Sequence, residues 1–335
     1  RMTRREAVKK ALCHEYVSPV PYQMDLTEDM EAILAKAAGD ADFFEHTGSY
    51  LRAARNESFV DLGGGRFADM FGVEWDRRQE GDFGVVSKYP VRDFDFGGYR
   101  FPEPDEALIR AKCEALAARK DFFTMYTIGF SLFERAWTLC SMEDVLCGFL
   151  LEPEFMGRLL DGILDYNLKV VKIVGEYDID CVFWGDDWGQ QKGLIMGYPS
   201  WKAFIRPRLE IMYRAVKDAG MFVAQHSCGD CSEVFPDLAA LGLDIYNTFQ
   251  PEIYDIAAFK EKYGKSIAFF GGISTQRLLP FATPEEVRRE TRRILKILSA
   301  GGGYILAPTH GMTPDIPPEN ALAFLEVCQN QEGEG

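Results

Sequence analysis

An imidazole and a thiol stand two residues apart at His226 and Cys228, after an apolar run that begins at Met221. Such a run predicts a buried strand, so the pair is expected where that strand ends. Imidazole and thiolate are the ligands that zinc prefers, and at this spacing both can reach one ion. A buried histidine beside a core thiol is the structural alternative. The two residues by themselves leave both interpretations open.

Cys231 completes a Cys-x-x-Cys pattern with Cys228. This pattern is shared by zinc sites, by redox pairs and by cysteines that are close only by coincidence. We favour coincidence, with Cys231 at the start of the next helix. The eight cysteines are scattered along the chain, and no secretion signal is recognised, so we expect reduced thiols in the cytoplasm.

Other chemistry-bearing residues follow other predicted strands. Because the carboxyl ends of parallel strands meet on one face, these side chains are expected to gather at one site. Asp187 is interpreted as a carboxylate that orients a ligand or acts as general acid or base, while its neighbour Asp186 could equally cap a helix. His310 follows the last predicted strand and is a second catalytic candidate. The residues expected to line the pocket are Asp25, Asp69, Phe130, Gln190, Gln250 and Glu252.

The elements that must position these residues alternate regularly after Pro104. Apolar runs typical of strands are separated by segments with helical periodicity, and this alternation predicts a parallel sheet. The predicted strands are 17–24, one in 43–62, 121–128, 179–184, 221–225, 244–248, 266–270 and 304–307. About eight such units in 335 residues predict an α/β fold, a (β/α)8 TIM barrel. An open doubly wound sheet would be expected to carry a Gly-x-Gly-x-x-Gly turn, and none is present.

Residues 43–100 break this alternation. Short apolar runs and glycines there favour strands and turns, so we expect a β-hairpin-containing excursion that acts as an irregular insertion or cap. The whole chain, 1–335, is otherwise expected to form a single barrel domain.

The charge balance excludes several classes of partner. The formal net charge is −15, whereas nucleic acids and anionic membranes require basic surface. No apolar stretch approaches the length of a membrane-spanning helix. We therefore expect no nucleic acid and no membrane as partner; the oligomeric state is left open, with a homodimer as one option.

Several motifs together resemble the uroporphyrinogen decarboxylase superfamily. They are His226-x-Cys228-Gly229, Gln250-Pro251, Phe270-Gly271-Gly272-Ile273, Thr283-Pro284-Glu285-Glu286, and the run from Gly302 to His310. The similarity is strongest over residues 180–330. The superfamily consists of (β/α)8 barrels and includes uroporphyrinogen decarboxylases and the cobalamin-dependent methyltransferases that act on methanol, methylamines, chloromethane and aryl methyl ethers.

The resemblance to the methyltransferase branch implies a zinc site. Those enzymes hold zinc through His-x-Cys and a late cysteine; His226 and Cys228 match the first two ligands, and His310 stands near the place of the third. This implies a zinc-dependent methyltransferase that moves a methyl group between a small methyl ether, amine or thiol and a corrinoid carried by a partner protein.

Two other functions are kept beside it. One is a metal-free decarboxylase of a tetrapyrrole or another carboxylated ring, in which His310 and an aspartate would manage protons. The arginine-rich N-terminal motif of the decarboxylases is missing, since Pro21–Asp25 stands in its region. This disfavours the decarboxylase, because a substrate with eight carboxylates must be met by cations. The other is a non-catalytic binder on the same scaffold.

Overall fold

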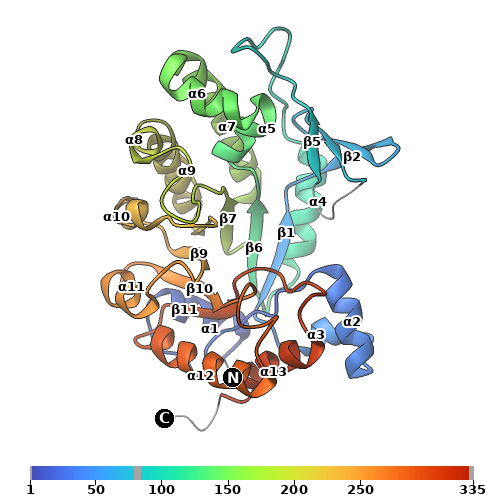
Figure 1. Ribbon diagram of the computed structural model, residues 1–335, viewed down its shortest axis with the longest axis vertical. Coiled ribbons are helices and arrows are strands. Elements are labelled where there is room, and N and C mark those ends of the chain that lie inside the picture. Colours follow the sequence, from blue (N-terminus) through green and yellow to red (C-terminus); the bar gives the residue numbers. More distant parts are fainter. Residues whose placement is uncertain (1, 79–83, 332–335) are drawn as a thin grey trace. The chain divides into compact units, whose positions relative to one another are not determined.

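The structure is a computed structural model that describes residues 2–78 and 84–331 (Figure 1). The chain divides into two compact units. Unit 1 comprises Arg1–Arg52, Arg119–Thr124 and Ala224–Gly335, and unit 2 comprises Ala53–Ala118 and Met125–Val223. Three of the four divisions fall inside the strands β1 (Leu51–Arg55), β6 (Phe123–Ile128) and β8 (Phe222–His226), and the fourth follows Ala118.

Unit 1 is built on parallel strands. β8 is followed in the sheet by β9 (Ile245–Phe249), β10 (Ala268–Ile273) and β11 (Tyr304–Pro308), in that order. In the β8–β9 register His226 stands opposite Asn247, and in the β10–β11 register Phe270 stands opposite Ile305. Every residue of β9, β10 and β11 is buried, as expected for strands covered on both faces.

Several helices of unit 1 begin with a side-chain cap. In α12 (Pro284–Ser299) Thr283 and Glu286 form a reciprocal capping box and proline occupies the first turn. In α2 (Glu28–Ala38) the Thr27 hydroxyl accepts from the Met30 N–H, and Gly39 ends the helix with a left-handed conformation. The long helices α12 and α13 (Pro318–Gln329) lie side by side (Figure 1). The other helices of unit 1 are α1 (Arg4–Leu12), α3 (Phe43–His46), the short η2 (Ser232–Val234), α10 (Phe235–Ala240) and α11 (Ile256–Tyr263).

The predicted first strand, residues 17–24, is wrong as an extended element. Only Tyr22 forms a bridge, with Leu306 of β11, supported by hydrogen bonds from Gln23 N to Leu306 O (2.9 Å) and from Leu306 N to Pro21 O (2.9 Å). Proline lacks an N–H, so Pro19 and Pro21 cannot donate to a ladder, and this limits the pairing to one bridge.

Unit 2 contains a second set of parallel strands. β1, β6 and β7 (Cys181–Gly185) are neighbours in this order, and β6 pairs with β7 from Met125–Cys181 to Ile128–Trp184. The 22-residue helix α7 (Pro153–Val174) buries twelve of its residues and packs against α4 (Glu106–Ala117), α6 and α9. The remaining helices of unit 2 are α5 (Phe133–Cys140), α6 (Met142–Leu151), α8 (Tyr198–Ser200), the π-helix η1 (Trp201–Ile205) and α9 (Arg206–Asp218).

The excursion predicted within 43–100 contains a separate antiparallel sheet. Its strands pair in sequence order, and β2–β3 is the expected hairpin. They are β2 (Phe59–Gly63), β3 (Arg66–Asp69), β4 (Glu74–Asp76) and β5 (Val85–Lys88). β1, which lies beside β6 in the main sheet, confirms the strand predicted within 43–62, whereas residues 43–46 of the predicted excursion are helical. Residues 79–83 of the predicted insertion lie outside the described residues. Among the described helices, none combines the length and apolar character needed to cross a membrane.

Candidate metal centre

Cys228 lies between two histidine rings in unit 1. Its Sγ is 3.4 Å from Nε2 of His226 and 3.3 Å from Nε2 of His310. His226 is the last residue of β8, and His310 follows β11 by two residues. The two rings are nearly perpendicular, at 78°, with centroids 6.3 Å apart. The structure therefore brings together the three residues that were predicted from the sequence as metal ligands.

Asn247 of β9 holds the far side of the His226 ring. Its Oδ1 is 2.6 Å from His226 Nδ1, and its Nδ2 donates to the Phe270 carbonyl at 3.2 Å. Parallel pairing places Asn247 opposite His226. Asn247 falls within the predicted strand 244–248, and its contact with His226 was missed because strand register is not visible in a single segment.

A different set of contacts shapes the turn that carries Cys228. Gln250 Oε1 accepts from the Gly229 N–H at 3.1 Å, and the Tyr254 hydroxyl donates to Gly229 O at 3.0 Å. The same hydroxyl accepts from the Cys231 N–H at 3.0 Å. Gln250 thus supports the turn that carries Cys228, while its predicted contact with substrate stays a prediction; Tyr254 is a support that the sequence prediction missed.

Cys231 is buried and its Sγ donates to Ser227 Oγ at 3.2 Å. Its backbone N–H is held by Tyr254 just before η2 begins. These contacts favour the interpretation that Cys231 is a structural residue at a helix start.

His310 has a looser support than His226. Its Nδ1 lies 3.4 Å from Thr275 Oγ1, which is itself 2.9 Å from Thr309 Oγ1. A Cβ added at Gly311 would lie 3.8 Å from Asp25 Oδ1, which places the exposed Asp25 beside the segment that carries His310.

The donor set fits zinc. A tetrahedral zinc with sulfur at about 2.3 Å and nitrogen at about 2.0–2.1 Å separates each sulfur and nitrogen by roughly 3.5 Å. The 3.3 and 3.4 Å separations around Cys228 are close to that spacing. Two imidazoles and one thiolate would leave a fourth position for a substrate, as catalytic zinc sites do.

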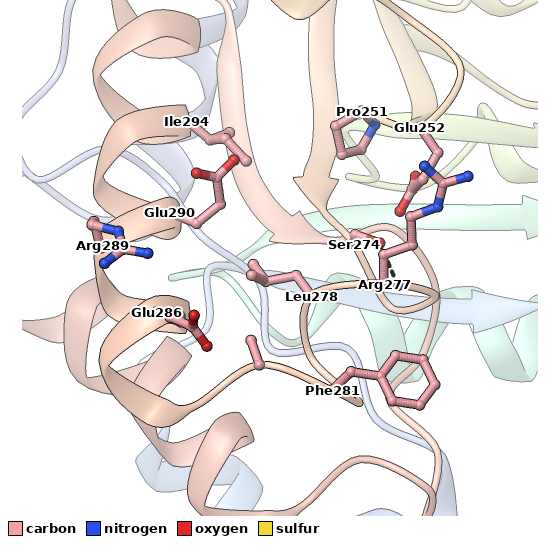
Figure 2. A pocket seen from close by; sticks show the side chains of 11 residues that line it. Pro251, Glu252, Ser274, Arg277, Leu278, Phe281, Glu286, Arg289, Glu290 and Ile294 are labelled. Carbon is pink, nitrogen blue, oxygen red and sulfur yellow. Dashed lines mark hydrogen bonds between the residues drawn. The ribbon is translucent and has the colours of Figure 1, made fainter.

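Glu252 lies in a separate cavity of about 480 Å³, whose lining includes none of the three candidate ligands. Glu252 and Arg277 stand at one end, and Glu286, Arg289 and Glu290 line the other end from α12 (Figure 2). Both carboxylate oxygens of Glu252 are buried without a hydrogen-bond partner, and burial raises the pKa of this carboxyl. Its predicted contact with substrate stays a prediction.

Asp186 of unit 2 is a helix cap. Its buried carboxylate accepts from the backbone N–H groups of Phe133 (3.0 Å) and Glu134 (2.8 Å) at the start of α5, and from the Trp188 indole N–H (2.6 Å). Burial raises the pKa of Asp186 to about 6. The capping interpretation of Asp186 therefore holds, and the adjacent Asp187 keeps its predicted catalytic role as a prediction.

Three further predicted pocket residues also lie in unit 2. Asp69 is buried in an ion pair with Arg135 (2.6 Å) and also accepts from the Trp75 indole N–H (3.1 Å), which are contacts of a structural group. The Phe130 ring packs on Trp75, with centroids 5.5 Å apart, and Gln190 is exposed. Contact of these three with substrate stays a prediction; Arg135 was missed because nothing local marks a buried arginine.

Comparison with known proteins agrees with this fold. The family model described as uroporphyrinogen decarboxylase (URO-D) matches residues 70–331. A uroporphyrinogen decarboxylase of Methylococcus capsulatus is 28% identical over 215 residues, covering 60% of this chain and 58% of that protein. A methylated-thiol–coenzyme M methyltransferase of Methanosarcina mazei is 21% identical over 197 residues, covering 59% of this chain and 50% of that protein. The chain thus spans about half the length of these curated relatives.

A solved structure of a methyltransferase from Methanosarcina mazei superposes over 99% of this chain and 100% of that one, with a TM-score of 0.74 at 16% identity. With the family match, this likeness confirms the predicted α/β fold of the TIM-barrel class.

Proposed function

Because the chain belongs to the uroporphyrinogen decarboxylase family, which matches residues 70–331, we propose that it is a zinc-dependent methyltransferase of that family. The observation that carries the proposal is the contact of Cys228 Sγ with Nε2 of both His226 and His310. A tetrapyrrole decarboxylase has no need of a thiol held between two imidazoles. The similarity to a methylated-thiol–coenzyme M methyltransferase supports the same choice.

His226, Cys228 and His310 would hold the zinc. When bound, zinc supplies a Lewis acid that polarises the oxygen, nitrogen or sulfur carrying the methyl group. The acceptor would be a corrinoid on a partner protein, and the donor a small methyl ether, amine or thiol. A zinc shell of two imidazoles and one thiolate donates less electron density to the metal than a shell of one imidazole and two thiolates does.

The remaining roles belong to this chain's own side chains. Asn247 and Thr275 hold the outer nitrogens of the two imidazoles, and Gln250 holds the turn that carries Cys228. Asp187 would orient the substrate or exchange a proton with it. Asp25, beside the His310 segment, would line the pocket.

Metal analysis tests the proposal. Purified protein should contain about one zinc per chain, and Cys228→Ala should lose it. Cys231→Ala is the matched control, because Cys231 belongs to the same turn but bonds to Ser227; it should retain the metal. A methyl-transfer assay with a corrinoid acceptor and methyl ethers, methylamines and methyl thioethers then identifies the donor class.

A metal-free decarboxylase is the second candidate, favoured by the similarity to the decarboxylase of Methylococcus capsulatus. Protein that holds no zinc after growth and reconstitution with zinc, yet releases carbon dioxide from uroporphyrinogen, would establish it and overturn the methyltransferase.

A further inference from the structure

The two imidazoles beside Cys228 are held by groups of different chemistry. His226 Nδ1 meets an amide, at 2.6 Å from Asn247 Oδ1, whereas His310 Nδ1 meets a hydroxyl, at 3.4 Å from Thr275 Oγ1. An amide has one end that only accepts and one end that only donates hydrogen bonds, but a hydroxyl can do either. The two supports therefore constrain their histidines differently.

The orientation of the Asn247 amide follows from its second contact. The Phe270 carbonyl oxygen can only accept, so the group facing it at 3.2 Å must be the NH2 of Asn247. The oxygen of the amide then faces His226. Asn247 is 9% exposed, so water has little access to compete for either end.

We propose that Asn247 is a positioning residue that fixes the tautomer of His226, so that Nδ1 carries the proton and Nε2 presents its lone pair to Cys228. The chain of contacts is directional: His226 Nδ1–H donates to Asn247 Oδ1, and Asn247 Nδ2 donates to Phe270 O. In the neutral ring this leaves Nε2, 3.4 Å from Cys228 Sγ, as the bare nitrogen. Thr275 imposes no such choice on His310.

The inference builds on the proposed zinc site, because a bare Nε2 is what a metal ligand requires; the tautomer itself can be read without metal. Nitrogen-15 NMR of the imidazoles in chelator-treated protein distinguishes the protonated from the bare nitrogen of each histidine, with His226→Gln identifying its signals. We expect a single Nδ1–H tautomer for His226 and averaged nitrogens for His310.

Asn247→Leu keeps the branching of the side chain at Cγ, in a somewhat larger volume, and removes both hydrogen bonds. It should convert the His226 signals to those of a tautomer mixture and weaken zinc binding by about 10- to 100-fold in a chelator competition, as loss of a group behind a metal-bound histidine does. Asn247→Asp retains an acceptor for Nδ1–H and should preserve the Nδ1–H form.

Asn320→Leu is the matched control. Asn320 is another buried asparagine of unit 1, and it donates to the carbonyls of Leu279 and Ala282, away from the cluster. It should lower stability without changing the His226 signals or zinc affinity. An Nδ1–H tautomer that persists in folded Asn247→Leu overturns the inference. Absence of zinc binding in the unaltered protein overturns the proposed function instead, while the NMR result still decides the role of Asn247.

Discussion

The thiol Sγ of Cys228 and the imidazole Nε2 of His310 lie 3.3 Å apart although 82 residues separate them in the chain. β8 and β11, which carry them, are separated in the sheet of unit 1 by β9 and β10. The cluster therefore depends on how β8 to β11 are arranged in the sheet. Each of its members can be tested by a separate substitution.

His310→Ala should remove one of the three proposed zinc ligands. The loss of zinc affinity should exceed the roughly 10- to 100-fold that is typical when only a supporting group behind a ligand is removed. Thr275→Val, which removes only the hydroxyl 3.4 Å from His310 Nδ1, is the control and should cost less. Chelator competition measures both. Equal affinities for His310→Ala and the unaltered protein would exclude His310 from the shell.

Asp69→Asn should strongly destabilise the protein. The ion pair with Arg135 is buried, with both side chains at most 2% exposed, so removing one charge leaves the other desolvated. The expected loss is about 3–5 kcal/mol in the free energy of unfolding, measured by urea denaturation. Glu103→Gln breaks an exposed pair with Lys169 and should cost less than about 1 kcal/mol. A small effect at Asp69 would leave its carboxylate available for substrate.

Glu252→Gln should stabilise the protein increasingly as pH rises. Burial raises the pKa of Glu252 in the folded state above its ordinary value of 4.5. The folded state therefore holds this proton longer than the unfolded state does. The stabilising contribution of protonated Glu252 is fully present below pH 4.5 and is lost as pH rises through the folded pKa. Glutamine stays neutral, so the variant does not lose this stability.

Glu286 lines the same cavity, and Glu286→Gln should change the stability with the opposite pH dependence. Hydrogen bonds from Thr283 lower the pKa of Glu286 in the folded state. The contribution of its carboxylate to stability is therefore present above the ordinary pKa and is lost as pH falls through the folded-state pKa. Urea unfolding from pH 3.5 to 8 compares the two variants. A difference for Glu252→Gln that stays constant with pH would contradict the prediction.

Asp186→Ala should weaken the start of α5. The carboxylate accepts from two backbone N–H groups of that helix and from the Trp188 indole, and all of these donors would be left buried without it. We expect a loss of about 1–3 kcal/mol in the free energy of unfolding. Asp144→Ala is the control, since Asp144 lies in the first turn of α6 but does not cap it with its side chain.

Helices with strong local signals were predicted accurately. The sequence predicts helices over 142–151, 284–299 and 318–329, and these are the bounds of α6, α12 and α13; proline or a capping residue marks the start of each. β11 was also recognised, because a buried strand is a short apolar run. In contrast, residues 17–24 look like a strand locally, but two prolines prevent a ladder from forming there.

The candidate site was predictable only in part, because local signals mark some of its residues but not their contacts with distant segments. His226 and Cys228 were recognisable from their spacing, and His310 from its place after the last strand. The support of His226 by Asn247 depends on register between two strands, and the pairing of Asp69 with Arg135 joins residues 66 positions apart. Such contacts arise from packing and leave no periodic signal in either segment.

The piecewise make-up of unit 1 bears on how the protein is synthesised. Unit 1 combines segments from the beginning, the middle and the last third of the chain, and all three candidate ligands lie in the final segment. A nascent polypeptide that has released His226 and Cys228 from the ribosome still lacks His310. Capture of zinc by all three proposed ligands must therefore wait until His310 has been synthesised and β11 has joined its neighbours in the sheet.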